Sequence, residues 1–304
     1  MTSPLRRLAL GLLASAALLA GPAAAADKLP VTASFSILGD LTAVVGGDRV
    51  AVHTLVGPDE DAHVFEPRPA DARRILQSRL LVLNGLGFEP WAQKLAKSAG
   101  YRGETVVVSK GVKTRALNGD KGHGHDHDHA DPHAWQNPDN VAQYVRNIAA
   151  ALSKIDPAGA DTYGANRDAY IRELQALDAW IRSQLATIPA AQRKVITSHD
   201  AFGYFAAHYQ VRFLAAQGVS TESAPSAREV GELIRQIKRE KIRTVFVESM
   251  SDPKLVAQLG KDAGASVGGS LYSDALSPTG KPAPNYLLMM RHNVTQLVQG
   301  MKQN

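Results

Sequence analysis

Half of the histidines in this chain lie in one short stretch. Five of ten fall within KGHGHDHDHADPHAW, which runs from Lys121 to Trp135. An alternation of His with Gly and Asp cannot pack as the core of a helix or strand, and neutral imidazole is the commonest metal ligand in proteins. The stretch therefore predicts a mobile, metal-collecting loop over about residues 113–131, and the alternative is a solvated polar loop without a role. The four alternating residues are His123, His125, His127 and His129.

His133 differs from the other four histidines of this stretch. It lies in the sequence Asp-Pro-His-Ala-Trp, at residues 131–135, where a proline and a tryptophan indicate ordered and packed chain. We therefore interpret His133 as a fixed metal ligand that receives an ion from the loop before it.

The segments around these histidines alternate between short apolar strands and amphipathic helices. This alternation predicts βα units and parallel sheets, because a parallel pair needs a crossover connection. We expect an α/β protein of two lobes, each with a central four-stranded parallel sheet flanked by helices. The expected strands cover residues 31–36, 50–56, 80–84, 105–109, 194–197, 212–216, 244–247 and 266–272, and the expected helices cover 37–45, 69–77, 91–99, 137–155, 201–209, 226–240, 253–263 and 286–301.

One further helix is expected to join the two lobes. Asp156-Pro157 is a typical helix start, and the chain then runs to Thr187 without another proline. A helix of that length extends roughly 46 Å, which is longer than a small domain is wide. The domain prediction is therefore a first lobe at 27–155, a rigid spine helix at 156–187 and a second lobe at 188–304.

Ligands of open parallel sheets bind outside the carboxyl ends of the strands, and this rule selects among the polar residues. Four metal-competent side chains lie in segments that follow expected strands, two in each lobe: His63, His133, His199 and Asp274. Three imidazoles and one carboxylate suit tetrahedral Zn²⁺. Asp200 and Glu248 also lie at strand ends, where they are candidates for holding an imidazole N–H. The rule excludes His53, His208 and His292, and we expect Glu66 to cap or orient the loop that carries His63.

Composition indicates an exported globular protein. The chain has 304 residues, 44% apolar and 21% charged residues, and no cysteine. Arg6 and Arg7, the apolar run 8–19 and Ala24-Ala25-Ala26 predict a signal peptide over residues 1–26. Without cysteine there is no disulfide, no thiolate ligand and no lipid-attachment thiol, so we expect a free periplasmic protein without direct membrane insertion. Scattered Lys and Arg residues indicate no nucleic-acid partner.

The order of these motifs resembles the metal-binding solute-binding proteins of ABC transporters, the cluster A-I family, and most closely its zinc-specific branch. The motifs are DAHVFEP at 61–67, the His-rich loop, DPHAW at 131–135, SHDAFGYF at 198–205 and Ser273-Asp274. The resemblance implies one ion held between two lobes and delivered to an inner-membrane permease. It implies the same four ligands. Manganese-type relatives usually have Glu at the third ligand position, and the His199 of this chain therefore favours Zn(II).

These observations favour a zinc carrier rather than an enzyme, because a filled four-coordinate site leaves no position for an activated water. The alternative within the class is a manganese or iron carrier. A zinc hydrolase using Asp274 or Glu66 as a general base is the alternative from another class, and no HExxH pattern supports it. We further expect a monomer, a periplasmic metallochaperone as a second candidate partner, and metal release through motion of the loop around His133.

Overall fold

The computed structural model describes residues 27–116 and 130–304. The expected signal peptide and the four loop histidines His123, His125, His127 and His129 lie outside the described residues. The first half contains β1 (Leu29–Phe35), α1 (Ser36–Gly46), β2 (Val50–Val56), α2 (Pro69–Gln77), β3 (Leu80–Leu83), α3 (Pro90–Ala99), β4 (Glu104–Val107) and α4 (Pro138–Ile155). The second half contains α5 (Ala160–Ala186), β5 (Lys194–Thr197), α6 (Gly203–Tyr209), β6 (Arg212–Ala215), α7 (Ala227–Glu240), β7 (Thr244–Val245), α8 (Pro253–Ala263), β8 (Ser266–Val267) and α9 (Tyr286–Met301).

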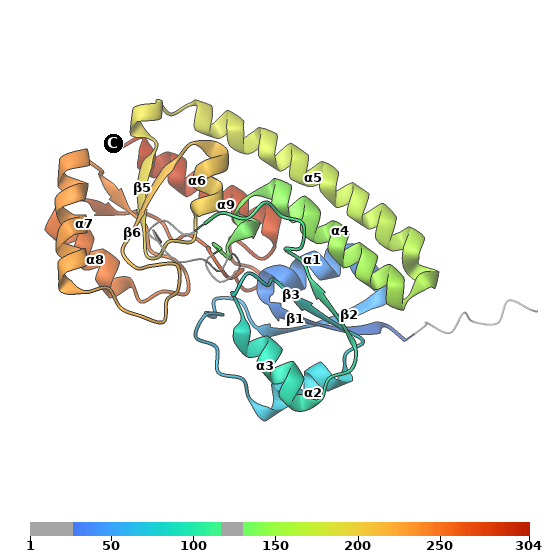
Figure 1. Cartoon of the computed structure of the whole chain (residues 1–304). Coiled ribbons are helices and arrows are strands. Elements are labelled where there is room, and N and C mark those ends of the chain that lie inside the picture. The colour runs from blue at the N-terminus through green and yellow to red at the C-terminus, as the bar shows by residue number, and fades with distance from the viewer. Residues whose placement is uncertain (1–26, 117–129) are drawn as a thin grey trace, which may run out of the picture.

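Two parallel sheets form the centres of two lobes (Figure 1). The strand order is β2-β1-β3-β4 in the first sheet and β6-β5-β7-β8 in the second. In each sheet the chain winds outward in both directions from a central pair of strands, and such reversal points are where parallel sheets bind ligands. The predicted fold class, α/β with two four-stranded parallel sheets, is confirmed.

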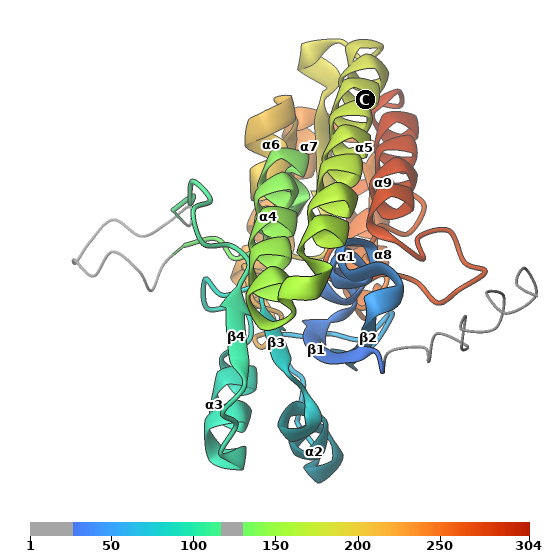
Figure 2. The same cartoon turned by 90° about the vertical axis from the view of Figure 1, so that its right-hand side faces the viewer.

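Strand β3 shows why helices cover both faces of the first sheet. Its sequence is Leu-Leu-Val-Leu, and alternate side chains of a strand point to opposite faces. Leu80 and Val82 pack into the core that α1 and α4 share, whereas Leu81 and Leu83 pack against α2 and α3 on the other face. Figure 2 shows α2 and α3 at one end of the molecule, with α1 and α4 across the sheet from them.

Helix α5 extends alongside both lobes (Figures 1 and 2). It packs against α1 and α4 of the first lobe and against α9 of the second. Its 27 residues extend about 40 Å. A single 3-10 turn, Pro157–Gly159, precedes it, and Gly159 packs against Arg49, Asp156 and Tyr163 where a side chain would collide. In the described part of the chain, no helix combines the length and apolar character needed to cross a membrane.

The last two strands are shorter than expected. Regular pairing of β7 with β8 covers two residues of each, instead of 244–247 and 266–272. The ladder is interrupted at Gly268 and Gly269, where the backbone packs closely on the Phe246 and Gln296 side chains, and a single parallel bridge between Glu248 and Leu271 follows. The residues after this break approach the first lobe rather than continuing the sheet.

One apolar core extends through both lobes. It joins Val31 and Leu80 of the first sheet, Leu177 of α5, Val195 of the second sheet and Met289 of α9, all at most 1% exposed. Two smaller clusters lie on the outer faces of the sheets, under α2 and α3 and under α7 and α8. The lobes are therefore packed onto a common core rather than connected by a flexible linker.

Candidate metal centre

The four candidate ligands converge between the lobes, at the carboxyl edges of both sheets. His63 lies in the loop after β2, and His133 directly precedes the 3-10 turn Ala134–Gln136. His199 follows β5 by two residues, and Asp274 lies beyond the Glu248–Leu271 bridge. One ligand atom from each residue fits within a group whose members all lie within 4.8 Å of one another. The strand-end rule had selected these four residues, and the structure brings all four together.

The distances between ligand atoms fit a four-coordinate ion. Nε2 of His63 lies 3.3 Å from Nε2 of His133 and 3.3 Å from Oδ2 of Asp274. Nε2 of His199 lies 3.0 Å from Oδ2 of Asp274, and Nε2 of His133 lies 3.6 Å from Oδ1. Atoms placed about 2.0–2.2 Å from a tetrahedral Zn²⁺ lie roughly 3.3–3.6 Å from one another. The contacts of His63 and His133 lie at these separations, the contact between His199 and Asp274 is shorter, and the four donors together lie within 4.8 Å of one another.

The ligand atoms are buried and point at one another without ordinary partners. His133, His199 and Asp274 are 0% exposed. Nε2 of His199 and both carboxylate oxygens of Asp274 form no well-directed hydrogen bond with the described residues. Buried polar atoms are usually paired, because an unpaired one costs free energy. A cation at the centre of the group would satisfy these atoms together.

A buried aspartate fixes the orientation of His133. Oδ1 of Asp131 accepts the backbone N–H of His133 at 3.0 Å and lies 2.9 Å from its Nδ1, so that Nε2 faces the site. The other oxygen, Oδ2, pairs with Arg115 at 3.0 Å. Gly203 makes room for this pair, because a side chain there would collide with both partners. Second partners of this kind set the tautomer and orientation of metal-binding imidazoles.

Glu248 contacts His199 by charge and close approach rather than by a well-directed hydrogen bond to the ring, and it also reaches a second ligand loop. Its Oε2 lies 2.5 Å from Nδ1 of His199 and accepts the hydroxyl of Ser273 at 2.5 Å. Its Oε1 accepts the backbone N–H of His199 at 2.9 Å. One carboxylate with 0% exposure therefore connects the loop that carries His199 with the residue next to Asp274.

The first lobe holds the Asp274 loop from the opposite side. The carbonyl of Ser273 accepts hydrogen bonds from Trp135 Nε1 and Gln136 Nε2, both at 2.8 Å. The hydroxyl of Tyr286, at the start of α9, donates to the carbonyl of Trp135 at 2.7 Å. These contacts connect ligands from different lobes through a few buried residues.

The charges of the site shift the pKa values of its groups. Burial lowers the pKa of His133, but the negative charge of Asp274 and the hydrogen bond to Asp131 outweigh it and raise that pKa to about 9. Burial also opposes the charged form of His199, whose pKa is nevertheless raised by Glu248 and Asp274. Burial would raise the pKa of Asp274, yet the two imidazoles hold it well below its usual range. The site therefore favours positive charge at its centre.

The remaining polar candidates lie elsewhere or act differently. Glu66 is exposed, and Asp200 donates its backbone N–H to the carbonyl of Gly218. His208 contacts Asp178 on the spine helix, and His292 lies 2.8 Å from the carbonyl of Ser270. Sequence reasoning missed Asp131, although its position two residues before His133 is a signal for a side chain that turns back onto the following backbone.

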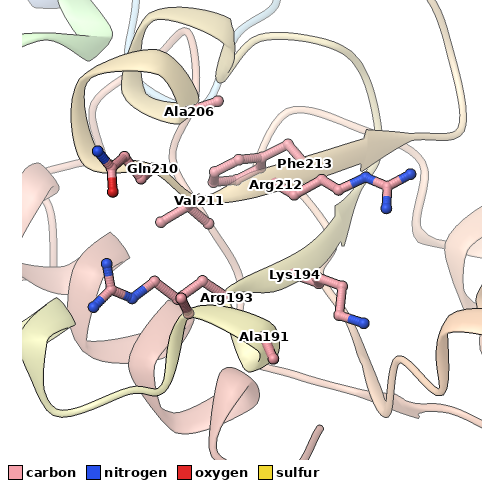
Figure 3. A pocket seen from close by; sticks show the side chains of 9 residues that line it. Ala191, Arg193, Lys194, Ala206, Gln210, Val211, Arg212 and Phe213 are labelled. Atoms are coloured by element: carbon pink, nitrogen blue, oxygen red, sulfur yellow. The ribbon is translucent and has the colours of Figure 1, made fainter.

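The surface hollow in Figure 3 is remote from these ligands. It has a volume of about 710 Å³, and Lys194 and Arg212, the first residues of β5 and β6, line it. It therefore lies at the amino edge of the second sheet, opposite His199. Arg212 is paired there with Glu240 at 2.7 Å.

Several known proteins are similar to this chain over nearly their whole length. The manganese-binding lipoprotein MntA of Halalkalibacterium halodurans is 32% identical, with 91% of this chain and 90% of that protein covered. The iron-binding protein YfeA of Yersinia pestis is 33% identical, with 93% and 89% covered. The iron ABC transporter substrate-binding lipoprotein MtsA of Streptococcus pyogenes is 31% identical, with 91% and 90% covered.

The names of these relatives correct the expected localisation. We expected a periplasmic protein without a lipid anchor, on the ground that the sequence has no cysteine. MntA and MtsA are lipoproteins by name, and their alignments cover about nine-tenths of this chain. The expectation of a free, unanchored protein was therefore wrong.

Solved structures agree with the fold and the class of ligand. The periplasmic zinc binding protein TroA of Treponema pallidum has a TM-score of 0.82 at 27% identity, covering 90% of this chain and 99% of TroA. A manganese-bound mutant of a periplasmic metal binding protein from Candidatus Liberibacter asiaticus has a TM-score of 0.81 at 30% identity, with 90% and 99% covered. The family described as ZnuA, the periplasmic component A of the zinc-uptake complex, matches residues 31–300. This chain therefore belongs to the ZnuA family, the periplasmic metal-binding substrate-binding proteins of ABC transporters.

Proposed function

We propose that this protein captures one Zn²⁺ between its lobes and delivers it to an ABC permease in the inner membrane. The ligands in this proposal are His63, His133, His199 and Asp274. Members of this family bind and hand over a metal, so the chain is not an enzyme. The four loop histidines at 123–129 are proposed as an accessory that raises the local zinc concentration.

The observation that carries the proposal is the closed set of four buried donors. Three imidazole nitrogens and one carboxylate are the donor types that zinc accepts in tetrahedral sites. Four of the distances between their donor atoms are 3.0–3.6 Å, and one donor atom from each residue lies within 4.8 Å of the others. Asp131 and Glu248 hold two of the imidazoles with Nε2 directed at the centre, as zinc-binding histidines require.

Manganese or iron is the second candidate cargo, and the names of the relatives favour it more than zinc. MntA is named for manganese, and YfeA and MtsA are named for iron. Manganese prefers oxygen donors, whereas imidazole suits iron as well as zinc. The donor set of this chain therefore speaks against manganese more strongly than against iron.

A competitive titration of the metal-free protein with zinc, manganese and ferrous iron tests the proposal. Wild type is compared with His133→Ala, with a deletion of residues 122–129, and with His53→Ala as a control outside the site. We expect one tight zinc site in wild type, in the deletion variant and in the control, and its loss in His133→Ala. Tighter binding of manganese or iron overturns the choice of cargo, and loss of tight binding with the loop overturns the choice of ligands.

A further inference from the structure

The three imidazoles of the site are held unequally. His133 and His199 each have Nδ1 beside a buried carboxylate, from Asp131 and Glu248. Among the residues that the structure describes, no carboxylate pairs with Nδ1 of His63. The backbone N–H of His63 instead donates to Oδ1 of Asp61 at 2.8 Å, and its ring packs edge-on against Phe88. The position of His63 therefore depends on its loop rather than on a partner of its ring.

That loop is attached to the second lobe. The hydroxyl of Thr221 donates to Oδ2 of Asp61 at 2.7 Å, although the two residues are 160 positions apart in the sequence. The backbone N–H of Asp59 donates to the carbonyl of Leu276 at 2.9 Å. A hollow of about 400 Å³, lined by Asp61 and Thr221, opens beside the first contact, at the boundary between the lobes. Asp61 thus joins His63 to a side chain of the opposite lobe.

We propose that Thr221 is a positioning residue for metal retention, acting through Asp61 on His63. While the Thr221 hydroxyl holds one carboxylate oxygen of Asp61, the other oxygen keeps the His63 backbone in its ligating position. When this contact opens, His63 is the first ligand to leave the ion. This inference rests on the proposed function, because it concerns the same four ligands.

The contacts around His133 argue against our sequence-based expectation that metal is released through motion of the loop around this residue. The carbonyl of Asp131 accepts the Tyr204 hydroxyl at 3.0 Å, and the carbonyl of Pro132 accepts from Asn84 Nδ2 at 3.0 Å. Asp131 is also paired with Arg115. Releasing His133 breaks several buried hydrogen bonds, whereas releasing His63 requires opening of a half-exposed loop.

The test measures the rate of metal release with a chelator in excess, using zinc-loaded protein. Thr221→Val removes the hydroxyl while keeping the shape, Thr221→Ser keeps the hydroxyl, and Ser220→Ala is a control in the same loop. Loss of one part-buried hydrogen bond to a carboxylate should speed release about tenfold in Thr221→Val. Thr221→Ser and Ser220→Ala should release zinc at close to the wild-type rate. Cobalt-loaded Thr221→Val should keep the visible absorption of four-coordinate Co²⁺, because all four ligands remain.

A double-mutant cycle with Asp61→Ala tests the route of the effect. If Thr221 acts through Asp61, Thr221→Val adds nothing to the release rate of Asp61→Ala. The inference is overturned if the double variant releases zinc faster than Asp61→Ala by the factor measured for Thr221→Val alone. It is also overturned if Thr221→Val releases zinc at the wild-type rate. Neither result bears on zinc capture itself. Wild-type protein without a tight metal site instead overturns the proposed function.

Discussion

Replacing Glu248 by Gln should weaken zinc binding far more than its distance from the metal suggests. The substitution keeps the shape but replaces one of two accepting oxygens by an NH₂ donor. In the native protein, Oε2 lies 2.5 Å from Nδ1 of His199 and from the Ser273 hydroxyl. An NH₂ at that position faces the Nδ1–H donor that the ligating tautomer presents. The imidazole must then either leave a buried donor unpaired or move its proton to Nε2, which blocks the metal. If the amide turns over, its NH₂ faces the backbone N–H of His199 instead, and a buried donor is again left unpaired.

The structure places the size of this effect at the upper end of what such partners contribute. Outer partners of metal-binding histidines contribute about 10- to 100-fold in affinity, or about 1.4–2.8 kcal/mol. Glu248 is 0% exposed and contacts His199 through both oxygens, so we expect about 100-fold. By comparison, Glu66→Gln changes an exposed carboxylate in the His63 loop and should leave the affinity unchanged.

Competition with a zinc chelator of known affinity measures both variants at neutral pH. Chemical unfolding of the metal-free proteins, measured in parallel, shows whether Glu248→Gln is folded. A folded Glu248→Gln protein that binds zinc within about threefold of wild type would refute the reasoning that a carboxylate must hold His199.

Three further predictions concern protons and packing. Because the pKa of His133 is raised to about 9 and that of His199 is also raised, zinc must displace protons at neutral pH. The zinc affinity should therefore rise between about pH 6 and pH 9. Calorimetry that detects no proton release on zinc binding would contradict this prediction. Burial raises the pKa of Asp40 from 3.8 to about 6, so its ionised form destabilises the folded state above that pKa by about 3 kcal/mol and not below about pH 4. Asp40→Asn should therefore stabilise the metal-free protein at neutral pH but not at about pH 4, and equal unfolding free energies of variant and wild type at neutral pH would count against it. Leu174→Ala in α5 removes a side chain that is 2% exposed in the common core and should lower the unfolding free energy by about 3 kcal/mol, whereas a loss below about 1 kcal/mol would indicate a loosely packed spine.

The sequence predicted what depends on local pattern and on the topology of parallel sheets. The four candidate ligands follow from one rule, because carboxyl ends of parallel strands share an edge. The role of Glu248 remained one of two options, since its contact with His199 depends on the packing of distant strands. The contact of Thr221 with Asp61 joins positions 160 residues apart and leaves no pattern in the sequence. The lengths of β7 and β8 were overestimated, because glycine packing rather than strand propensity ends them.

The identity of the bound metal also cannot be predicted from the types of the ligand residues alone. Relatives of this chain that are 30–33% identical are named for manganese, for iron or for metal in general. Selectivity among such ions depends on geometry, donor type and metal availability rather than on affinity alone. Residue types alone therefore do not identify the ion, because the same donors can be held in different geometries.

The apolar core that runs from the first sheet through α5 to α9 gives the two lobes a shared interior. Neither half has a complete interior of its own, so a gene fragment that encodes a single lobe lacks the partner surface that buries its helices. Exchange of whole lobes between relatives would require compensating substitutions at all the core positions where the two lobes meet. Natural variation in cargo is then expected to arise in the loops at the sheet edges, which can change without disturbing the shared interior.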